Sequence, residues 1–316
     1  MFAMHQKYLF SNLIGTFVFN EHFNVLDKKM FKDIEQYGNR EKTEQEFSKK
    51  YSNLKKPEGN EVKKILEFFK DKQYFNDFHT QNLVLTKRLV KESVKGDLLI
   101  IQAIDNIGEI DKSVNILIKR LREWYALYNP EFEHSLQNQE KFVELILKKD
   151  KKELLREINA NEPMGADLSK EDLEPIMDLA KELDQVYQLR KKQEAYLAQL
   201  MKKVCPNLLA ITGSTLGGKL LAQSGSLKHL SEFPASTIQL LGAEKALFRH
   251  MKTKSAAPKY GFLHEHPLIS RNQKELHGKI ARSLADKISI AVKVDYFKGK
   301  FIGDKLYKEL EEKFKK

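Results

Sequence analysis

The 316-residue sequence predicts a mainly α fold with a small α/β N-terminal domain, a long antiparallel coiled-coil hairpin and an all-α C-terminal domain. Three observations support this fold class. They are an aromatic and β-branched run near the N-terminus, a heptad repeat in the middle, and short apolar segments separated by turn residues after residue 205. A chain of this length fits two or three domains. We place their boundaries at 1–96, 97–205 and 206–316.

The N-terminal domain is predicted to open with strands and to fill its core with phenylalanine. Residues 8–19 are rich in Leu, Ile, Val and Phe around Gly15, which favours one or two strands over a helix. Eleven of the 19 phenylalanines precede residue 97. Because a small domain needs large side chains to fill its core, we expect most of them to be buried. The alternative is that a few form an exposed protein-binding patch.

The middle of the chain predicts a helical rod that begins near Gly96. Apolar residues repeat there in strict heptads, which is typical of a coiled coil. The helix is expected to end at Tyr128, because Asn129 and Pro130 follow. At a rise of 1.5 Å per residue the rod is about 48 Å long. The a positions are Ile100, Ile107, Val114, Leu121 and Tyr128, and the d positions are Ala103, Ile110, Leu117 and Trp124.

A second long helix is predicted to start at Ser169, after a break at 159–167, because Asp172 completes a pattern that resembles a capping box. Its apolar seam matches the first rod in length. An antiparallel hairpin is therefore favoured, and a parallel homodimer is the alternative that the same heptads allow. The polar pair Arg190 and Gln193 interrupts the seam, and it is expected to fix the register or to leave a gap for another chain.

The C-terminal domain carries nearly all of the excess positive charge. Residues 206–316 contain 20 Lys and Arg against 10 Asp and Glu, whereas the first 205 residues have a net charge of +1. This asymmetry indicates an anionic partner, and nucleic acid is favoured over a membrane because no Lys-rich amphipathic helix with an aromatic face occurs there. Lys245 and Arg249 would share one helix face beside Phe248, on which a nucleic-acid end could stack. The alternative is a buried Leu247 and Phe248 with solvated charges.

Patterns typical of enzymes are incomplete in this sequence. Residues 213–219 match the first seven positions of a phosphate-binding loop, but Leu220 stands where Ser or Thr would hold magnesium. Tight helix packing is the favoured role of these glycines. His264 and His266 lack a third metal ligand, and Cys205 has no histidine partner in the sequence. No metal site and no catalytic residue is predicted.

Cysteine usage and hydropathy predict a soluble protein of the cytoplasm without membrane contact. A single cysteine excludes an intramolecular disulfide. The sequence has neither the pattern of a signal peptide nor an 18-residue apolar stretch that could span a bilayer.

Several motifs in the basic domain together resemble the Nop-domain family. Their order and spacing cover residues 206–296, and the segment 120–125 in the rod is similar to the coiled coil of the same family. Residues 294–297 and the short basic end at Lys316 are similar to the archaeal fibrillarin-partner core proteins of box C/D small ribonucleoproteins. The spliceosomal relative usually departs from the motif at 242–249. The motifs are Pro206-Asn207-Leu208, Gly225-Ser226-Leu227, residues 234–239, residues 241–249, Pro258-Lys259-Tyr260-Gly261 and Gly278-Lys279-Ile280-Ala281-Arg282.

The resemblance implies a non-catalytic scaffold for guide-directed rRNA 2′-O-methylation in an archaeal cytoplasm. The N-terminal domain would bind the methyltransferase fibrillarin, which would itself carry S-adenosylmethionine. The coiled coil would pair with a second copy of the chain. The Nop domain would bind box C/D guide RNA at a kink-turn, together with a kink-turn-binding subunit that resembles a ribosomal protein. The alternative is a spliceosomal-type assembly factor without a methyltransferase partner.

The family's RNA-proximal elements, Gly-Ala-Glu-Lys and Ala-Leu-Phe-Arg, correspond to residues 242–245 and 246–249 of this sequence. Basic residues elsewhere in the domain extend the expected RNA surface. The residues expected to contact RNA are Lys219, Lys228, Gly242, Ala243, Glu244, Lys245, Phe248, Arg249, Lys252, Lys259, Lys279 and Arg282. Those expected to form the dimer interface are Ile107, Val114, Leu121, Leu183 and Val186.

Overall fold

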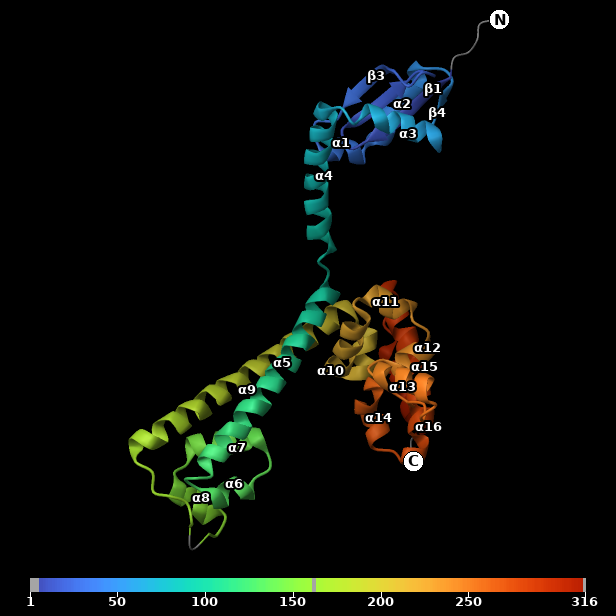
Figure 1. Ribbon diagram of the computed structural model, residues 1–316. Helices are drawn as coiled ribbons and strands as arrows, with labels where there is room; N and C mark the ends of the chain where they lie inside the picture. Colours follow the sequence, from blue (N-terminus) through green and yellow to red (C-terminus); the bar gives the residue numbers. More distant parts are fainter. Residues whose placement is uncertain (1–5, 161–162, 315–316) are drawn as a thin grey trace, which may run out of the picture. The chain divides into compact units, whose positions relative to one another are not determined.

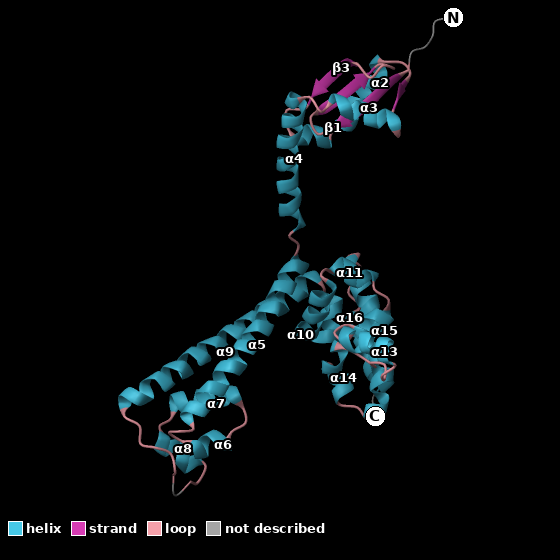
Figure 2. Cartoon of the chain, viewed as in Figure 1, coloured by secondary structure: helices cyan, strands magenta, loops and turns pink. Residues whose placement is uncertain are grey.

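The computed structural model describes residues 6–160 and 163–314, and it divides into two compact units between Val94 and Lys95 (Figure 1). Part of the predicted break at 159–167, and the basic end at Lys316, lie outside the described residues. Strands occur only in the first unit among the described residues, and helices make up the second (Figure 2). The predicted fold class, mainly α with a small α/β domain at the N-terminus, is confirmed.

The first unit is built on a four-stranded sheet with the order β3-β2-β1-β4. Strands β1 (Lys7–Asn12), β2 (Gly15–Phe19) and β3 (Val25–Met30) are antiparallel, and the short β4 (Leu54–Lys55) lies parallel to β1. The central strand β2 is wholly buried, which confirms the strands predicted over 8–19. The helices of this unit are α1 (Ile34–Gly38), α2 (Arg40–Lys50), α3 (Asn60–Phe68) and α4 (Lys72–Ser93).

Phenylalanine fills the core of the first unit, as predicted, but not along α4. Phe17 and Phe19 are fully buried, and their rings contact those of Phe68 and Phe69. Helix α4, in contrast, has no buried residue. Phe75 and Phe78 on this helix are exposed, so the core interpretation is wrong for these two side chains.

The second unit begins with the hairpin of α5 (Gly96–Tyr125) and α9 (Lys170–Val204), which lie side by side (Figure 1). The two helices are antiparallel, because the start of α5 and the end of α9 share one core cluster and their other ends share a second. Ser169 caps α9 by accepting a hydrogen bond from the amide of Asp172. The favoured antiparallel hairpin is thereby confirmed.

The heptad register of α5 is correct at the a positions Ile100, Ile107, Val114 and Leu121, but it is wrong at the last two d positions. The predicted d positions Leu117 and Trp124 are 39% and 37% exposed, whereas the next residues, Ile118 and Tyr125, are buried. A helix with 3.6 residues per turn drifts about 20° per heptad, so a strict seven-residue seam rotates away from its partner. The d positions therefore shift by one residue in the second half of α5, to Ile118 and Tyr125, while Leu121 stays buried.

Four of the five residues predicted to form the dimer interface are core residues of the hairpin itself. Ile107, Val114, Leu121 and Leu183 are buried, and Val186 packs against the same core. Side chains enclosed within one chain cannot contact a second copy. The prediction that these residues form the dimer interface is therefore corrected, and any such interface must use other side chains.

A polar contact fixes the register of the hairpin at its middle. Arg190 on α9 donates from Nε to a carboxylate oxygen of Asp111 on α5 over 2.5 Å, and its Nη1 lies 2.9 Å from Glu194. The Asp111 carboxylate raises the pKa of the Arg190 guanidinium. The predicted register-fixing role belongs to Arg190, while Gln193 is half-buried beside it.

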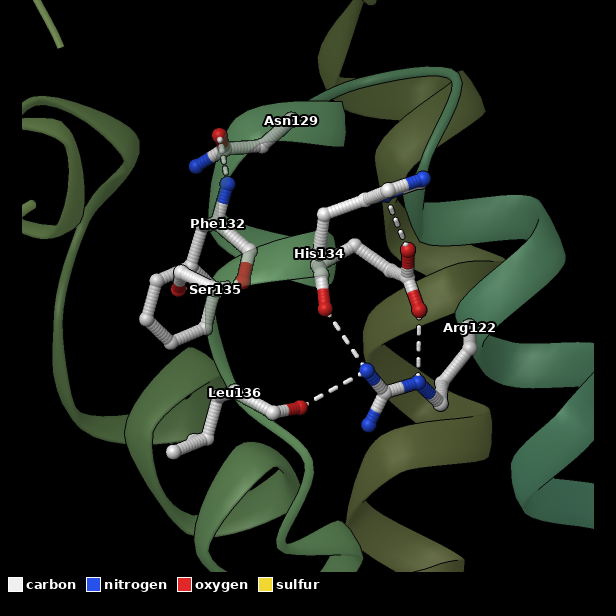
Figure 3. Close-up of polar contacts among 7 residues, drawn as sticks. Arg122, Asn129, Phe132, His134, Ser135 and Leu136 are labelled. Atoms are coloured by element: carbon white, nitrogen blue, oxygen red, sulfur yellow. Dashed lines mark hydrogen bonds and ion pairs between the residues drawn. The ribbon is translucent and has the colours of Figure 1, made fainter.

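Three short helices close the far end of the hairpin, and Arg122 binds the first of them to α5 (Figure 3). Its Nε donates to the Glu133 carboxylate over 2.6 Å, and its Nη2 donates to the backbone oxygens of Glu133 and Leu136. Asn129 accepts a hydrogen bond from the amide of Phe132 and thereby caps the first of these helices. Helix α5 ends at Tyr125, three residues before the predicted Tyr128. The three helices are α6 (Pro130–Ser135), α7 (Gln139–Lys148) and α8 (Lys151–Glu157).

The C-terminal helices pack against the hairpin through α10 (Pro206–Ser224). A Cβ on Gly218 would lie 3.2 Å from Ile104 of α5, and one on Gly217 would lie 2.5 Å from the Met201 side chain of α9. Residues 213–219 lie within this helix, which bends at Gly213 with φ of +72°. The glycines thus serve helix packing, and the phosphate-loop alternative is wrong.

The start of α10 is held by a buried polar network with α15 (Lys274–Tyr296). Asp295 on α15 accepts hydrogen bonds from the amides of Asn207 and Leu208 and from Asn207 Nδ2, at 2.7 to 3.1 Å. Asn207 Oδ1 accepts in turn from the amide of Ile302. Burial raises the pKa of the Asp295 carboxyl, against the opposing effect of these hydrogen bonds.

The remaining C-terminal helices surround α15, which runs through the middle of the C-terminal core. No helix in the described part of the chain has both the length and the apolar composition needed to cross a bilayer. These helices are α11 (Leu227–Glu232), α12 (Ala235–Leu240), α13 (Glu244–Thr253), the 3-10 helix η1 (Phe262–Glu265), α14 (Pro267–Ser270), α15 (Lys274–Tyr296) and α16 (Gly303–Phe314).

Candidate nucleic-acid interface

Helix α13 presents two cations and an aromatic ring to solvent. None of its residues is buried, and Phe248 is 59% exposed. Lys245 and Arg249 are exposed one helical turn apart, and neither side chain has a hydrogen bond or ion pair within the described residues. Leu247 is half-buried. The alternative in which Phe248 belongs to the core is therefore wrong.

The turn before α13 explains the glycine at its start. Gly242 has φ of +86°, a region that side chains rarely adopt, and an added Cβ would lie 2.7 Å from the ring of Phe262. Its amide donates to the Glu244 carboxylate over 2.8 Å, and the amide of Ala243 donates to Leu240. Gly242, Ala243 and Glu244 thus set the position at which α13 begins.

The segment after α13 folds back onto α12 and positions Lys259. The amides of Gly261 and Phe262 donate to the backbone oxygens of Gln239 and Leu241 at 3.0 and 2.7 Å. The side-chain amide of Gln239 donates to the backbone oxygen of Lys259 over 2.6 Å. The two motifs at 234–239 and 258–261 are therefore held together by main-chain geometry.

Three of the predicted cations meet in one groove of about 650 Å³. Lys259 enters it from the segment after α13, and Lys279 and Arg282 enter from α15; none of the three has an ion pair within the described residues. A groove lined by unpaired cations is suited to a phosphate backbone. The other lining residues are Gln239, Ala257, Pro258, Glu275, Gly278, Ser283 and Lys313.

Two groove residues were missed by the sequence prediction. Lys313 lies on α16 and donates to the hydroxyl of Ser283 on α15, a contact across 30 residues that no local pattern indicates. Gln239 lies inside a motif that was recognised, but its side chain had no predicted role.

Two predicted cations are engaged elsewhere. Lys219 on α10 binds both carboxylate oxygens of Glu265 at 2.7 Å and lines a separate cleft between α5 and α10. Lys228 on α11 lies 3.9 Å from Glu232. Lys252 is exposed on α13, next to the other cations of that helix. The structure therefore brings the predicted residues together as two sets, one on α13 and one in the groove.

The residues considered for chemistry have structural roles. His266 is buried, its Nε2 lies 2.9 Å from the backbone oxygen of Ile211, and burial lowers its pKa. Burial raises the pKa of the Cys205 thiol, which lies at the junction of α9 and α10. Within residues 6–160 and 163–314, no three His, Cys, Asp or Glu side chains gather closely enough to hold a metal ion.

Comparisons with known proteins indicate one family. The Nop model, described as a snoRNA binding domain, fibrillarin, matches residues 106–316. An uncharacterized NOP5 family protein of Methanocaldococcus jannaschii is 38% identical over 268 residues, which are 77% of this chain and 64% of that protein. Nucleolar protein 58 of Neosartorya fischeri and of Aspergillus fumigatus are each 38% identical over 240 residues, 69% of this chain and 41% of theirs.

The chain spans less than two thirds of the length of these relatives. Among solved structures, a chain of a fibrillarin/Nop5p complex aligns over 94% of this chain and 98% of its own length, at 24% identity and a TM-score of 0.46.

Proposed function

Because the chain belongs to the Nop family, we propose that it is a non-catalytic scaffold of a box C/D ribonucleoprotein. In this proposal it links the methyltransferase fibrillarin to a guide RNA that contains a kink-turn, and the assembly methylates RNA at the 2′-hydroxyl. S-adenosylmethionine is bound by fibrillarin. A kink-turn-binding protein shares the RNA, and the assembly works in the cytoplasm of an archaeal cell.

The observation that carries the proposal is the set of unpaired cations on α13 and in the neighbouring groove. Lys245 and Arg249 flank the exposed ring of Phe248, and Lys259, Lys279 and Arg282 line the groove. Cations without carboxylate partners neutralise phosphates at no cost in broken ion pairs, and an exposed ring offers a surface for base stacking. The net charge of +10 over residues 206–316 supports the same partner.

The first unit supports the proposed contact with a protein partner. It carries 17 Lys and Arg against 13 Asp and Glu over residues 1–94, a smaller excess of positive charge than in residues 206–316, and α4 exposes Phe75 and Phe78. Exposed aromatic side chains are enriched at protein interfaces. We therefore assign fibrillarin binding to residues 1–96 and RNA binding to 206–316.

A fibrillarin pull-down by the full chain separates this proposal from the alternative, a Nop-type assembly factor without a methyltransferase partner. Immobilised fibrillarin should retain the chain, and the chain should retain kink-turn RNA in the presence of the kink-turn-binding protein. RNA binding without fibrillarin binding would favour the alternative. Loss of both would contradict the family-based proposal as a whole.

Self-association is proposed through apolar side chains that the hairpin leaves outside its core. Ile116, Leu117, Trp124 and Leu127 are exposed on or just after α5. A buried interface of such side chains is the usual way for two helical hairpins to pair. These four residues replace the buried ones first assigned to the interface.

Replacing Trp124 with glutamate should convert the dimer to a monomer. A carboxylate at the centre of an apolar interface loses its hydration without gaining a partner, which costs several kcal/mol. Light scattering should report a mass falling from twice 36.8 kDa to 36.8 kDa. Leu26→Glu, an exposed apolar position in the first unit, is the matched control and should remain a dimer. A Trp124→Glu variant that stays dimeric would exclude this surface.

A further inference from the structure

The loop between α15 and α16 presents aromatic and basic side chains that the proposed RNA surface does not use. Phe297 is 76% exposed and Phe301 is 53% exposed. Lys298 and Lys300 alternate with them, and both are exposed without an ion pair within the described residues. The ring of Tyr296 contacts that of Phe297 edge to face, with centroids 5.0 Å apart. Exposed apolar side chains that lie together, unlike single ones, are typical of interaction sites.

Backbone and side-chain hydrogen bonds hold the backbone of this loop in place. The amide of Gly299 donates to the Val294 oxygen over 2.8 Å, and the amide of Lys298 donates to the Asp295 oxygen over 3.2 Å. These two bonds form the Schellman motif that commonly ends a helix. At the other end of the loop, the amide of Ile302 is held by Asn207. The two phenylalanines are thus displayed from a rigid frame, which limits the entropy that binding would cost.

Lys298 occupies a position at which glycine is strongly preferred. It is the residue after the helix cap, and its φ is +54°, in the left-handed region that strains a side-chain-bearing residue. A lysine at this position adds a positive charge to the segment between Phe297 and Phe301, although glycine would suit the backbone better.

Further cations lie shortly before Asn207 in the sequence. Asn207, which binds Asp295 and Ile302, follows four residues after Lys203 at the end of α9. Lys202 and Lys203 are exposed and have no ion pair within the described residues. The exposed Asp304 is the only acidic residue between 296 and 305, a segment with three lysines. The surface around the loop is therefore basic as well as aromatic.

We infer that the loop of residues 296–301, with Lys202 and Lys203, is a second RNA-binding surface that takes an unpaired RNA strand. Unpaired bases can stack on Phe297 and Phe301, while the lysines neutralise the phosphates between them. The loop lies fifteen residues beyond Arg282 along α15, or about 22 Å at 1.5 Å per residue. It is therefore distinct from the groove. The inference rests on the proposed function, since it concerns the same RNA.

Binding of oligouridylate to the full chain tests this surface. The chain is first saturated with a blunt kink-turn hairpin and the kink-turn-binding protein, so that α13 and the groove are occupied. Fluorescence anisotropy then measures the affinity for labelled oligouridylate. Phe297→Ala and Phe301→Ala should each weaken it by about 5-fold or more, the usual loss for one base–aromatic stack. Leu26→Ala, which removes an exposed apolar side chain from the first unit, is the control and should leave the affinity unchanged.

Lys298→Gly separates RNA binding from folding. Glycine relieves the left-handed strain, so the melting temperature should stay the same or rise. Affinity for oligouridylate should nevertheless fall. The slope of log K against log salt should decrease by the contribution of one phosphate contact.

Three outcomes are distinguishable. Failure of the kink-turn RNA to bind at the first step would refute the proposed function. If the kink-turn RNA binds but oligouridylate does not, only the second surface is overturned. The same holds if oligouridylate binds the phenylalanine variants as well as it binds the unaltered chain. Unchanged oligouridylate affinity together with lost fibrillarin binding in those variants would identify a protein contact and would also overturn it.

Discussion

Replacing Lys245 and Arg249 together with alanine should weaken binding of the kink-turn RNA complex by about 100-fold. Each side chain is exposed and unpaired on α13, so each is free to form a charge-assisted hydrogen bond to a phosphate. At about 1.5 kcal/mol for each such bond, losing two costs roughly 3 kcal/mol. Anisotropy titrations over a range of salt concentrations should show the loss. The slope of log K against log salt should become shallower by about two phosphate contacts.

The same double variant should bind fibrillarin normally, because its substitutions lie outside the proposed fibrillarin-binding unit. The matched control replaces Lys148 on α7 and Lys181 on α9 with alanine, which removes the same charge from exposed positions outside the C-terminal domain. This control should retain RNA affinity within a factor of about two. Each of the two exposed ion pairs that it removes contributes little to the stability of the fold. Equal losses in both double variants would show that net charge, and not α13, governs binding. Loss of fibrillarin binding would indicate damage to the fold.

Replacing Asp295 with alanine should destabilise the second unit by about 3 kcal/mol or more. The substitution leaves two backbone amides and the Asn207 side chain without an acceptor in a buried site, and each unsatisfied group costs about 1–3 kcal/mol. The melting temperature of the second unit should therefore fall by roughly 6–12 °C, as expected at 2–4 °C per kcal/mol for a unit of this size. Circular dichroism at 222 nm follows the transition, because this unit is helical.

Asp286 on the same helix provides the control for Asp295. It is exposed and has no ion pair within the described residues, so Asp286→Ala should change the melting temperature by no more than 1–2 °C, corresponding to about 0.5 kcal/mol. The melting temperature of Asp295→Asn should lie between those of Asp295→Ala and Asp286→Ala, because the asparagine amide keeps one acceptor oxygen. A melting temperature unchanged by Asp295→Ala would show that the contact with Asn207 does not hold α10 in place.

Periodic patterns predicted the elements of this fold better than their exact contacts. The heptads correctly indicated two long antiparallel helices, because an apolar seam is a local property of the sequence. They placed Leu117 and Trp124 in the core wrongly, because the straight helix drifts relative to a seven-residue repeat. Leu121 is buried inside the hairpin at its predicted a position, so it is unavailable for the dimer interface to which it was also assigned.

The candidate site was predictable in part. Local spacing placed Lys245 and Arg249 on one exposed helix face, as the structure has them. Lys219 was assigned to RNA from its charge alone, and its partner Glu265 lies 46 residues away, a distance that no local pattern bridges. The groove depends equally on tertiary contacts, since it joins Lys259 with Arg282 through the turn that Gln239 holds. Whether these residues bind RNA stays a prediction.

Reconstituted methylation tests the central claim, that the chain connects a methyltransferase to a guide RNA. The reaction contains fibrillarin, S-adenosylmethionine, the kink-turn-binding protein, a guide RNA and its complementary substrate, with or without the full chain. Methyl transfer to the 2′-hydroxyl of the nucleotide selected by the guide should require the chain, and the Lys245 and Arg249 double variant should abolish most of it. Equal methylation without the chain, or none from a complex that has assembled completely, would contradict the scaffold role.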